Sequence, residues 1–399
     1  MPFDFSHEFG ENPSYDIEFS VPQIHRLRFT NDCFGDDFET LRDLFEPSVA
    51  QSPKVQIWID AALSIGSKSI ASRARQQFDA ASELDVVGLS TLQGGEAVKN
   101  DPEIINGLLR SFDSAHLDRR SYVVAVGGGA FLDAVGYAAA VAHRGLRLVR
   151  VPTTTLSQSD SGVGVKNAVN WFGKKNWKGT FATPWAVVND AAVLNSLNDR
   201  DFHCGFSEAV KVALLKDTNF FEYLCEHAEA IADREHTPSQ VALKQSVLLH
   251  MQHITRGGDP FESLQARPLD FGHWSAHKLE AVTEYQLRHG EAVSIGVALD
   301  TAYSYLTQGL PLQVAEQTLT ALQNLRLPIW HQALESQALF EGLEEFRQHL
   351  GGELTITLIE DAGEPVNVHS IKLGAMREAI EMVRYYAGAD QISHTKAQV

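Results

Sequence analysis

The chain has 399 residues, 44% of them hydrophobic and 21% charged, and a formal net charge of -18 at pH 7. This length exceeds what one hydrophobic core usually serves, so we expect two domains. The acidic balance argues against nucleic acid or an anionic membrane as a partner, because both need a basic surface. Three widely separated cysteines, a polar N-terminus and the absence of a long apolar run predict a cytoplasmic protein with no disulfide framework and no membrane span.

The first half of the chain alternates predicted strands and helices. Residues 55–60 and 84–89 are short runs rich in β-branched residues, which is typical of buried parallel strands, and 67–81 between them has helical composition. Residues 121–152 then give a strand, three glycines, an alanine-rich helix and a second strand. This order indicates a β-α-β unit with a glycine turn at the end of its first strand.

The second half changes character, because helical periodicity dominates from about residue 198 and only 353–361 alternates like a strand. We therefore predict an α/β N-terminal domain with a parallel Rossmann-like sheet, residues 1–197. A mainly α-helical C-terminal domain, residues 198–399, is expected to follow it and to carry metal- and substrate-binding groups.

The glycine turn consists of Gly127, Gly128 and Gly129. Successive glycines let backbone N–H groups approach a phosphate, and the start of the following helix adds partial positive charge. A tight strand-to-helix turn without any ligand is the alternative. The G-x-G-x-x-G fingerprint is not present, so an ordinary Rossmann dinucleotide site is not supported.

A long polar segment, 151–176, follows the second strand of this unit. It contains charged and amide side chains suited to a phosphorylated, hydroxyl-rich substrate, namely Asp160, Lys166, Asn170, Lys175 and Asn176. A solvated surface loop is the alternative, although loops of this length in compact domains are more often functional.

Histidines and one carboxylate in the second half suggest a metal site. His273 and His277 are four residues apart and share one helix face, and His289 follows. Together with Glu208 they could form a His₂-Glu site with an open coordination position. Each histidine could instead be an ordinary core or surface residue, and Glu208 with Lys211 could be a surface ion pair.

These segments, in this order, resemble the sugar phosphate cyclase superfamily, which includes 3-dehydroquinate synthase, over roughly 60–361. The resemblance implies that Glu208, His273 and His289 bind one divalent metal, zinc or cobalt. It also implies NAD as the cofactor, with contacts from Asp60, Glu96, Lys99, Gly127, Gly128, Gly129, Asp133, Thr153, Thr154 and Lys175.

The same resemblance assigns a substrate site. Lys166, Lys211, His277 and Asn176 match its catalytic positions, so His277 would face substrate and not metal. The further substrate contacts would be Arg144, Asp160, Arg267, Asp270 and His349. Arg144 matches an arginine that reaches into the partner subunit's site, which implies a homodimer.

The resemblance also implies a reaction on one sugar phosphate. NAD⁺ transiently oxidises a ring hydroxyl held at the metal, and phosphate then leaves by β-elimination. The hydride is returned, the ring opens, and an intramolecular aldol addition closes a carbocycle.

Several positions that are basic in 3-dehydroquinate synthases hold other residues here. Counted from His273, the lysine 21 places upstream falls on Gln252. The arginine seven places upstream falls on Ala266, with Arg267 adjacent, and the asparagine three places upstream is Asp270. An aspartate would repel the carboxylate of a 2-keto acid by roughly 4 kcal/mol at 4 Å and an effective dielectric of 20.

Near the C-terminus the usual lysine pair becomes Arg347 and Gln348, followed by His349. The loss of cations and the gain of Asp270 favour a neutral sugar end, as in cyclases that act on sedoheptulose 7-phosphate. Because His277 is retained, we favour a 2-epi-valiolone-type enzyme or an uncharacterised cyclase of that branch.

Three other functions stay open. One is 3-dehydroquinate synthase itself. Another is a metal-dependent polyol dehydrogenase, which would stop after the first hydride transfer; Glu208 and the segment 166–176 argue against it. The last is a catalytically silent relative that serves as a binding or scaffold protein.

Overall fold

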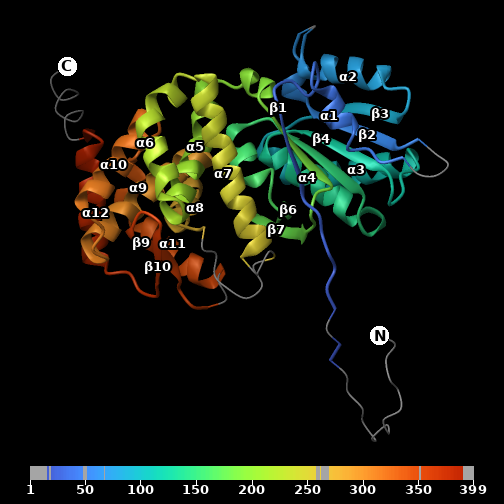
Figure 1. The fold of residues 1–399 in the computed structure, drawn as a ribbon. Helices are drawn as coiled ribbons and strands as arrows, with labels where there is room; N and C mark the ends of the chain where they lie inside the picture. The colour runs from blue at the N-terminus through green and yellow to red at the C-terminus, as the bar shows by residue number, and fades with distance from the viewer. Residues whose placement is uncertain are drawn as a thin grey trace, which may run out of the picture.

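The structure is a computed structural model that describes residues 16–17, 19–47, 52–66, 68–257, 261, 269–349 and 352–389, without the side chain of His349. A sheet-containing N-terminal part and a helical C-terminal part lie side by side (Figure 1). Sheet gives way to helices between η5 (Ala192–Ser196) and α5 (Asp199–Lys216).

The N-terminal part is built on one six-stranded sheet whose strands, within the described residues, pair in parallel. Its central strands are continuous apolar runs, which is expected where helices cover both faces. In spatial order the strands are β1 (Arg26–Thr30), β8 (Ala186–Asp190), β5 (Arg147–Pro152), β4 (Tyr122–Gly127), β2 (Lys54–Asp60) and β3 (Asp85–Leu92).

Successive side chains of β4 divide between two hydrophobic clusters, because strand side chains alternate in direction. Val124 and Val126 belong to the larger cluster, which includes residues of α1 (Phe38–Arg42) and α2 (Ile70–Ala80) and continues into the helical part. Val123 and Ala125 belong to the cluster that contains residues of α3 (Pro102–Ser114) and α4 (Gly129–Val141). The short helices η2 (Glu96–Lys99) and η3 (Ala142–Arg144) contact α4, whereas η1 (Ala61–Ser64) contacts α2.

The polar segment after β5 is not a loop. It contains a π-helical turn, η4 (Ser157–Ser161), and an antiparallel hairpin of β6 (Lys166–Trp171) and β7 (Lys174–Phe181). The interpretation of 151–176 as one extended loop is therefore wrong. The hairpin packs on α4 and lies beside the helical part (Figure 1).

The C-terminal part packs its helices around α9 (His289–Thr307), of which fourteen residues are buried. A helix that is apolar on every side belongs in the centre of a bundle. Around it lie α5, α6 (Thr218–Ala232), α7 (His236–Arg256), α8 (His273–Val282), α10 (Leu312–Asn324), η6 (Gln332–Glu335), α11 (Gln337–His349), α12 (Leu373–Tyr386) and a hairpin of β9 (Ile356–Asp361) and β10 (Glu364–Val368).

Helix α5 packs closely against the chain that leaves β5. A Cβ at Gly205 would lie 2.3 Å from the carbonyl carbon of Thr155, and the Thr155 hydroxyl donates to the carbonyl oxygen of Phe202 at 2.7 Å. Glycine is needed here because the two backbones approach each other. This contact brings the carboxyl edge of the sheet next to the helix that carries Glu208.

The predicted fold class is confirmed, as are the strands predicted near 55–60, 84–89 and 353–361. Strands β1, β8 and β10 were not predicted.

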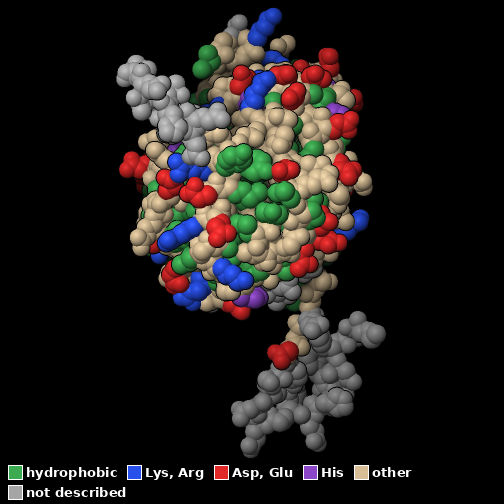
Figure 2. Space-filling view, turned by 90° about the vertical axis from the view of Figure 1, so that its left-hand side faces the viewer, with side chains coloured by type: hydrophobic (Ala, Val, Ile, Leu, Met, Phe, Trp, Pro, Cys, Tyr) green, Lys and Arg blue, Asp and Glu red, His purple; other side chains and the backbone are tan. Residues whose placement is uncertain are grey.

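On the end of the helical part seen in Figure 2, acidic and basic side chains are interspersed around a central group of hydrophobic ones. None of the described helices is both long and apolar enough to span a membrane.

Candidate functional site

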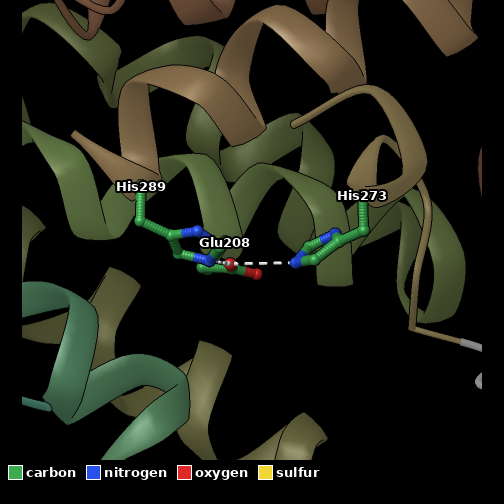
Figure 3. Close-up of side chains that lie close together, drawn as sticks. All are labelled: Glu208, His273 and His289. Atoms are coloured by element: carbon green, nitrogen blue, oxygen red, sulfur yellow. Dashed lines mark ion pairs between the residues drawn. The ribbon is translucent and has the colours of Figure 1, made fainter. Parts of the chain in front are cut away.

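Three side chains from three helices converge where the helical part faces the sheet. Glu208 comes from α5, His273 is the first residue of α8, and His289 is the first residue of α9. One ligand atom from each lies within 4.8 Å of the others, with both rings pointing at the carboxylate between them (Figure 3). The expected metal-binding residues are thus brought together.

The geometry of this cluster suits a metal ion. Glu208 is 2% exposed, and no described residue donates a hydrogen bond to its Oε1. Nε2 of His273 lies 3.5 Å from Oε1, and Nε2 of His289 lies 3.7 Å from it. These distances are long for hydrogen bonds but near the roughly 3.4 Å expected between neighbouring ligands of tetrahedral zinc with bonds of about 2.1 Å.

Both rings are held with Nε2 toward the cluster. Nδ1 of His273 lies 3.2 Å from the carbonyl oxygen of Phe271, and Nδ1 of His289 lies 3.0 Å from Oε2 of Glu280. Both partners are acceptors, so each ring donates its Nδ1–H away from the cluster and directs Nε2 toward it, where a metal ion would take the place of any proton on Nε2. Burial lowers the pKa of His289, but Glu280 and Glu208 outweigh burial and raise it to about 9.

Lys211 lies one turn from Glu208 with its Nζ 2.5 Å from Oε2, and both side chains are buried. The alternative of a surface ion pair is therefore wrong. Burial alone would raise the pKa of Glu208 and lower that of Lys211. The close pairing reverses both effects, so the pKa of Glu208 lies well below its usual value and that of Lys211 is raised. The cluster thus holds a carboxylate with an ammonium group beside it.

Asp160, in η4, adds a second carboxylate near Lys211 and contacts a histidine that the sequence did not indicate. Its Oδ1 lies 3.2 Å from Nδ1 of His250 on α7. Burial, together with the charge of Lys211, lowers the pKa of His250 despite Asp160. Asp270 also raises the pKa of Lys211, so it lies within electrostatic reach.

The sequence did not indicate His250, because the family's lysine position on α7 was located only by its fixed distance before His273. This distance includes residues 258–260 and 262–268, which lie outside the described residues. It points to Gln252, which is exposed. The face of α7 that meets Asp160 presents His250 instead. Glu280 was also missed, although it follows His273 by seven residues on one helix face, a spacing that could have indicated it.

Buried Arg150 positions the segment that carries Asp160 and Lys166. Its guanidinium donates to the carbonyl oxygens of Gly162 at 3.1 Å, Gly164 at 2.9 Å and Lys166 at 3.1 Å. Burial lowers the pKa of Arg150 to about 10. A cation that binds three carbonyl groups holds the turn between η4 and β6 in one conformation.

The glycine turn lies at the carboxyl end of β4, next to the end of β5. Thr153 donates its backbone N–H to the carbonyl oxygen of Gly127 at 3.0 Å, and Thr154 lies beside Gly128. Among the described residues, no side chain caps the start of α4, which begins at Gly129. The turn therefore presents an uncapped helix N-terminus, which suits a phosphate group.

The ends of β2 and β3 make a second close approach at the same edge. A Cβ at Gly94 would lie 1.8 Å from Oδ2 of Asp60, so a larger residue there would require the Asp60 carboxylate to move. Asp60 accepts the backbone N–H of Ala62 at 3.0 Å, and Glu96 accepts from Asn170 at 3.3 Å. The expected nucleotide-side residues therefore line one edge of the sheet.

Lysines join this edge to the hairpin and to the helices. Buried Lys99 lies 2.7 Å from Asp133 and also donates to Asn176. Lys175 lies 3.0 Å from Glu280 of α8. Asn176 and Lys175 are thus placed between the nucleotide side and the metal-ligand cluster.

His277 is exposed and lies next to two of the cluster residues. Its ring centroid is 5.6 Å from that of His273 and 6.1 Å from that of His289, stacked at 24°. This placement keeps it beside the cluster and solvent-accessible.

Of the predicted substrate-binding residues, Arg144 lies away from the site. Arg144 is exposed at the end of α4, at the amino edge of the sheet and so opposite the glycine turn. Arg267 lies outside the described residues, as does the side chain of His349. Arg347 pairs with Glu344 on its own helix at 2.6 Å.

The fold and the site define a class of two-part α/β proteins in which two histidines and a glutamate that could hold a metal ion lie where sheet and helices meet. The family model described as 3-dehydroquinate synthase N-terminal matches residues 89–204, and the one described as 3-dehydroquinate synthase C-terminal matches 205–347.

Named relatives agree with these matches. The chain is 34% identical to a 3-dehydroquinate synthase of Latilactobacillus sakei over 70% of this chain and 76% of the relative. It is 30% identical to a 2-epi-5-epi-valiolone synthase of Actinomyces over 76% of this chain and 80% of the relative. A 2-epi-5-epi-valiolone synthase structure from Streptomyces hygroscopicus superposes with a TM-score of 0.81 and 23% identity over 93% of this chain and 99% of that one. The chain belongs to the sugar phosphate cyclase superfamily, the 3-dehydroquinate synthase-like enzymes.

Proposed function

We propose that the chain is an NAD- and metal-dependent cyclase that converts sedoheptulose 7-phosphate to a carbocycle with loss of phosphate. The observation that carries this proposal is the buried cluster of Glu208, His273 and His289 with Lys211 beside it. A carboxylate and two imidazoles leave room for substrate oxygens on a bound metal.

The cofactor assignment draws on the sheet edge and on structural neighbours. The Streptomyces hygroscopicus valiolone synthase structure holds NAD⁺ and Zn²⁺, and a 2-deoxy-scyllo-inosose synthase structure holds NAD⁺ and Co²⁺. The glycine turn and the close approach of Gly94 to Asp60 supply a cradle for a dinucleotide here. When bound, NAD accepts and returns a hydride while the metal polarises a substrate oxygen.

We assign the following roles to side chains of the protein. Lys211 supplies positive charge beside the cluster, and Arg150 holds the turn that carries Asp160 and Lys166. His277 lies beside the cluster in contact with solvent, where its ring can exchange protons with a substrate hydroxyl. Asn176 and Lys175 lie between cofactor and substrate and orient one relative to the other.

The surroundings of Lys211 favour a neutral sugar end. Asp160 and Asp270 are close enough to raise the pKa of Lys211. On α7, His250 contacts Asp160, and its lowered pKa keeps the ring neutral. A carboxylate substrate would face those two acids, whereas hydroxyl groups can donate hydrogen bonds to them. This charge pattern supports sedoheptulose 7-phosphate over a 2-keto acid.

We further propose a homodimer in which Arg144 serves the neighbouring site. Its exposed position at the amino edge of the sheet leaves it available to a second subunit.

A second candidate function is 3-dehydroquinate synthase, which the names of several curated relatives favour. Incubating the metal- and NAD-loaded enzyme separately with sedoheptulose 7-phosphate and with the 3-dehydroquinate precursor, followed by NMR of the products, distinguishes the two. We expect a carbocycle only from sedoheptulose 7-phosphate. Turnover of the keto acid alone would replace our proposal with the second candidate.

A further inference from the structure

Asp300 is a fully buried carboxylate on α9, the helix that begins with His289. Its Oδ2 accepts the backbone N–H of Gly272 at 2.8 Å, and its Oδ1 accepts the indole N–H of Trp274 at 2.9 Å. Gly272 and Trp274 are the two sequence neighbours of His273. A single carboxylate therefore binds both sides of one cluster residue.

The turn before His273 is also pressed against α9. Gly272 adopts φ 78°, and a Cβ there would lie 2.5 Å from the backbone nitrogen of Val297. A Cβ at Gly296 would lie 2.0 Å from the carbonyl oxygen of Gly272. Because the two backbones are so close, the turn before His273 can move relative to α9 mainly by rotation. The two hydrogen bonds to Asp300 oppose that rotation.

Packing alone does not explain a carboxylate at position 300. Both of its hydrogen-bond donors among the described residues are uncharged, and burial raises the pKa of Asp300 to about 7. A buried acid without a cationic partner costs several kcal/mol, whereas an apolar side chain of similar size would not carry that cost. The polar group is explained if its two bonds serve the site.

We propose that Asp300 is a positioning residue for the metal site, which ties the start of α8 to α9 and so fixes His273 relative to His289. Removing a group that orients a metal ligand typically weakens metal binding 10- to 100-fold. The inference rests on the proposed metal site, so its test must tell the failure of one from the failure of the other.

The test compares zinc affinity of metal-free variants, measured by competition with a chromophoric chelator, alongside their melting temperatures. Asp300→Asn keeps the shape but turns an amide N–H₂ toward one of the two donors, and we expect zinc to bind about 10- to 100-fold more weakly. Thr301→Val is the matched control, because Thr301 is adjacent and buried and its hydroxyl has no hydrogen-bond partner among the described residues. The control should bind zinc as the unaltered protein does.

A double variant separates positioning from packing. Trp274→Phe removes the indole N–H, so in the Asp300→Asn background the amide oxygen is free to turn to Gly272. We expect the double variant to bind zinc more tightly than Asp300→Asn alone, whereas a packing role predicts a further loss. If Asp300→Asn does not fold, Trp274→Phe alone decides: weaker zinc binding supports the inference, and unchanged binding overturns it.

Glu208→Gln completes the set. Lost zinc binding in Glu208→Gln with unchanged binding in Asp300→Asn would overturn the role of Asp300 only. Unchanged zinc binding in Glu208→Gln would overturn the metal site itself, and the role of Asp300 with it.

Discussion

Glu280 and His289 form a carboxylate–imidazole pair, with Oε2 of the acid 3.0 Å from Nδ1 of the ring. The other oxygen of Glu280 lies 3.0 Å from Nζ of Lys175, on the hairpin of the sheet part. Burial raises the pKa of Glu280, but His289 and Lys175 outweigh it and hold the pKa well below its usual range. One ionised carboxylate therefore connects the metal-ligand cluster to the side of the site where we place the cofactor.

This pair gives the first prediction. Glu280→Gln keeps the shape but removes the charge that orients and polarises His289, so zinc should bind about 10- to 100-fold more weakly. Chelator competition on the metal-free protein measures this. Glu284→Gln, an exposed change nearby in sequence, should leave the affinity unaltered. Equal affinities in the two variants would show that Glu280 does not orient a ligand.

The second prediction concerns the buried pair of Lys211 and Glu208. Lys211→Met removes the ammonium group closest to Glu208, and breaking a buried ion pair in this way typically costs about 3–5 kcal/mol. A bound cation would compensate the same charge, so the metal-free protein should lose more stability than the zinc-loaded one. Urea unfolding with and without a chelator measures both. An equal loss in the two forms would argue against a metal at Glu208.

Asp270 gives the third prediction, which tests substrate choice. Asp270→Asn removes one negative charge near Lys211, so kcat/KM for the keto acid should rise relative to sedoheptulose 7-phosphate. Removing about 1.4 kcal/mol of repulsion corresponds to a tenfold change in this ratio. Steady-state phosphate release on both substrates measures it. A ratio that does not move would mean that Asp270 has no part in discrimination.

A fourth prediction tests the junction between sheet and helices. Gly205→Ala places a Cβ 2.3 Å from backbone atoms of the chain after β5, and overpacking of this kind costs about 1–3 kcal/mol. Gly107→Ala is the control, since nothing lies within 4 Å of its added Cβ in α3, and there alanine should stabilise by about 0.5–1 kcal/mol. Thermal unfolding should move in opposite directions for the two variants. Movement in the same direction would contradict the close contact.

Much of the architecture could be predicted from local pattern. The apolar runs that became β2, β3 and β4, and the helical spacing of His273 and His277, are signals contained within a few residues. Strands β1 and β8 were not predicted, because β1 is an edge strand and its pairing with β8 is decided by tertiary contacts. The hairpin of β6 and β7 was not predicted because β7 is mostly polar and exposed, and because one of the two buried positions of β6 is the polar Asn167.

The site divides in the same way. Glu208 and the glycine turn lie inside compact motifs, so they could be located in the sequence from the resemblance to a known family. His250 could not, because its place depends on how far the chain runs between α7 and α8 and not on its own surroundings in sequence. Asp300 could not either, because ten residues separate it from His289 and only the folded helix pair brings it to Gly272 and Trp274.

The central claim is a cyclase reaction, and one measurement tests it most directly. The metal- and NAD-loaded enzyme is given sedoheptulose 7-phosphate while inorganic phosphate and NADH absorbance are followed together. We predict stoichiometric phosphate release with no net NADH, because the hydride is returned within the same catalytic cycle. Accumulation of NADH without phosphate would contradict a cyclase and indicate a polyol dehydrogenase instead.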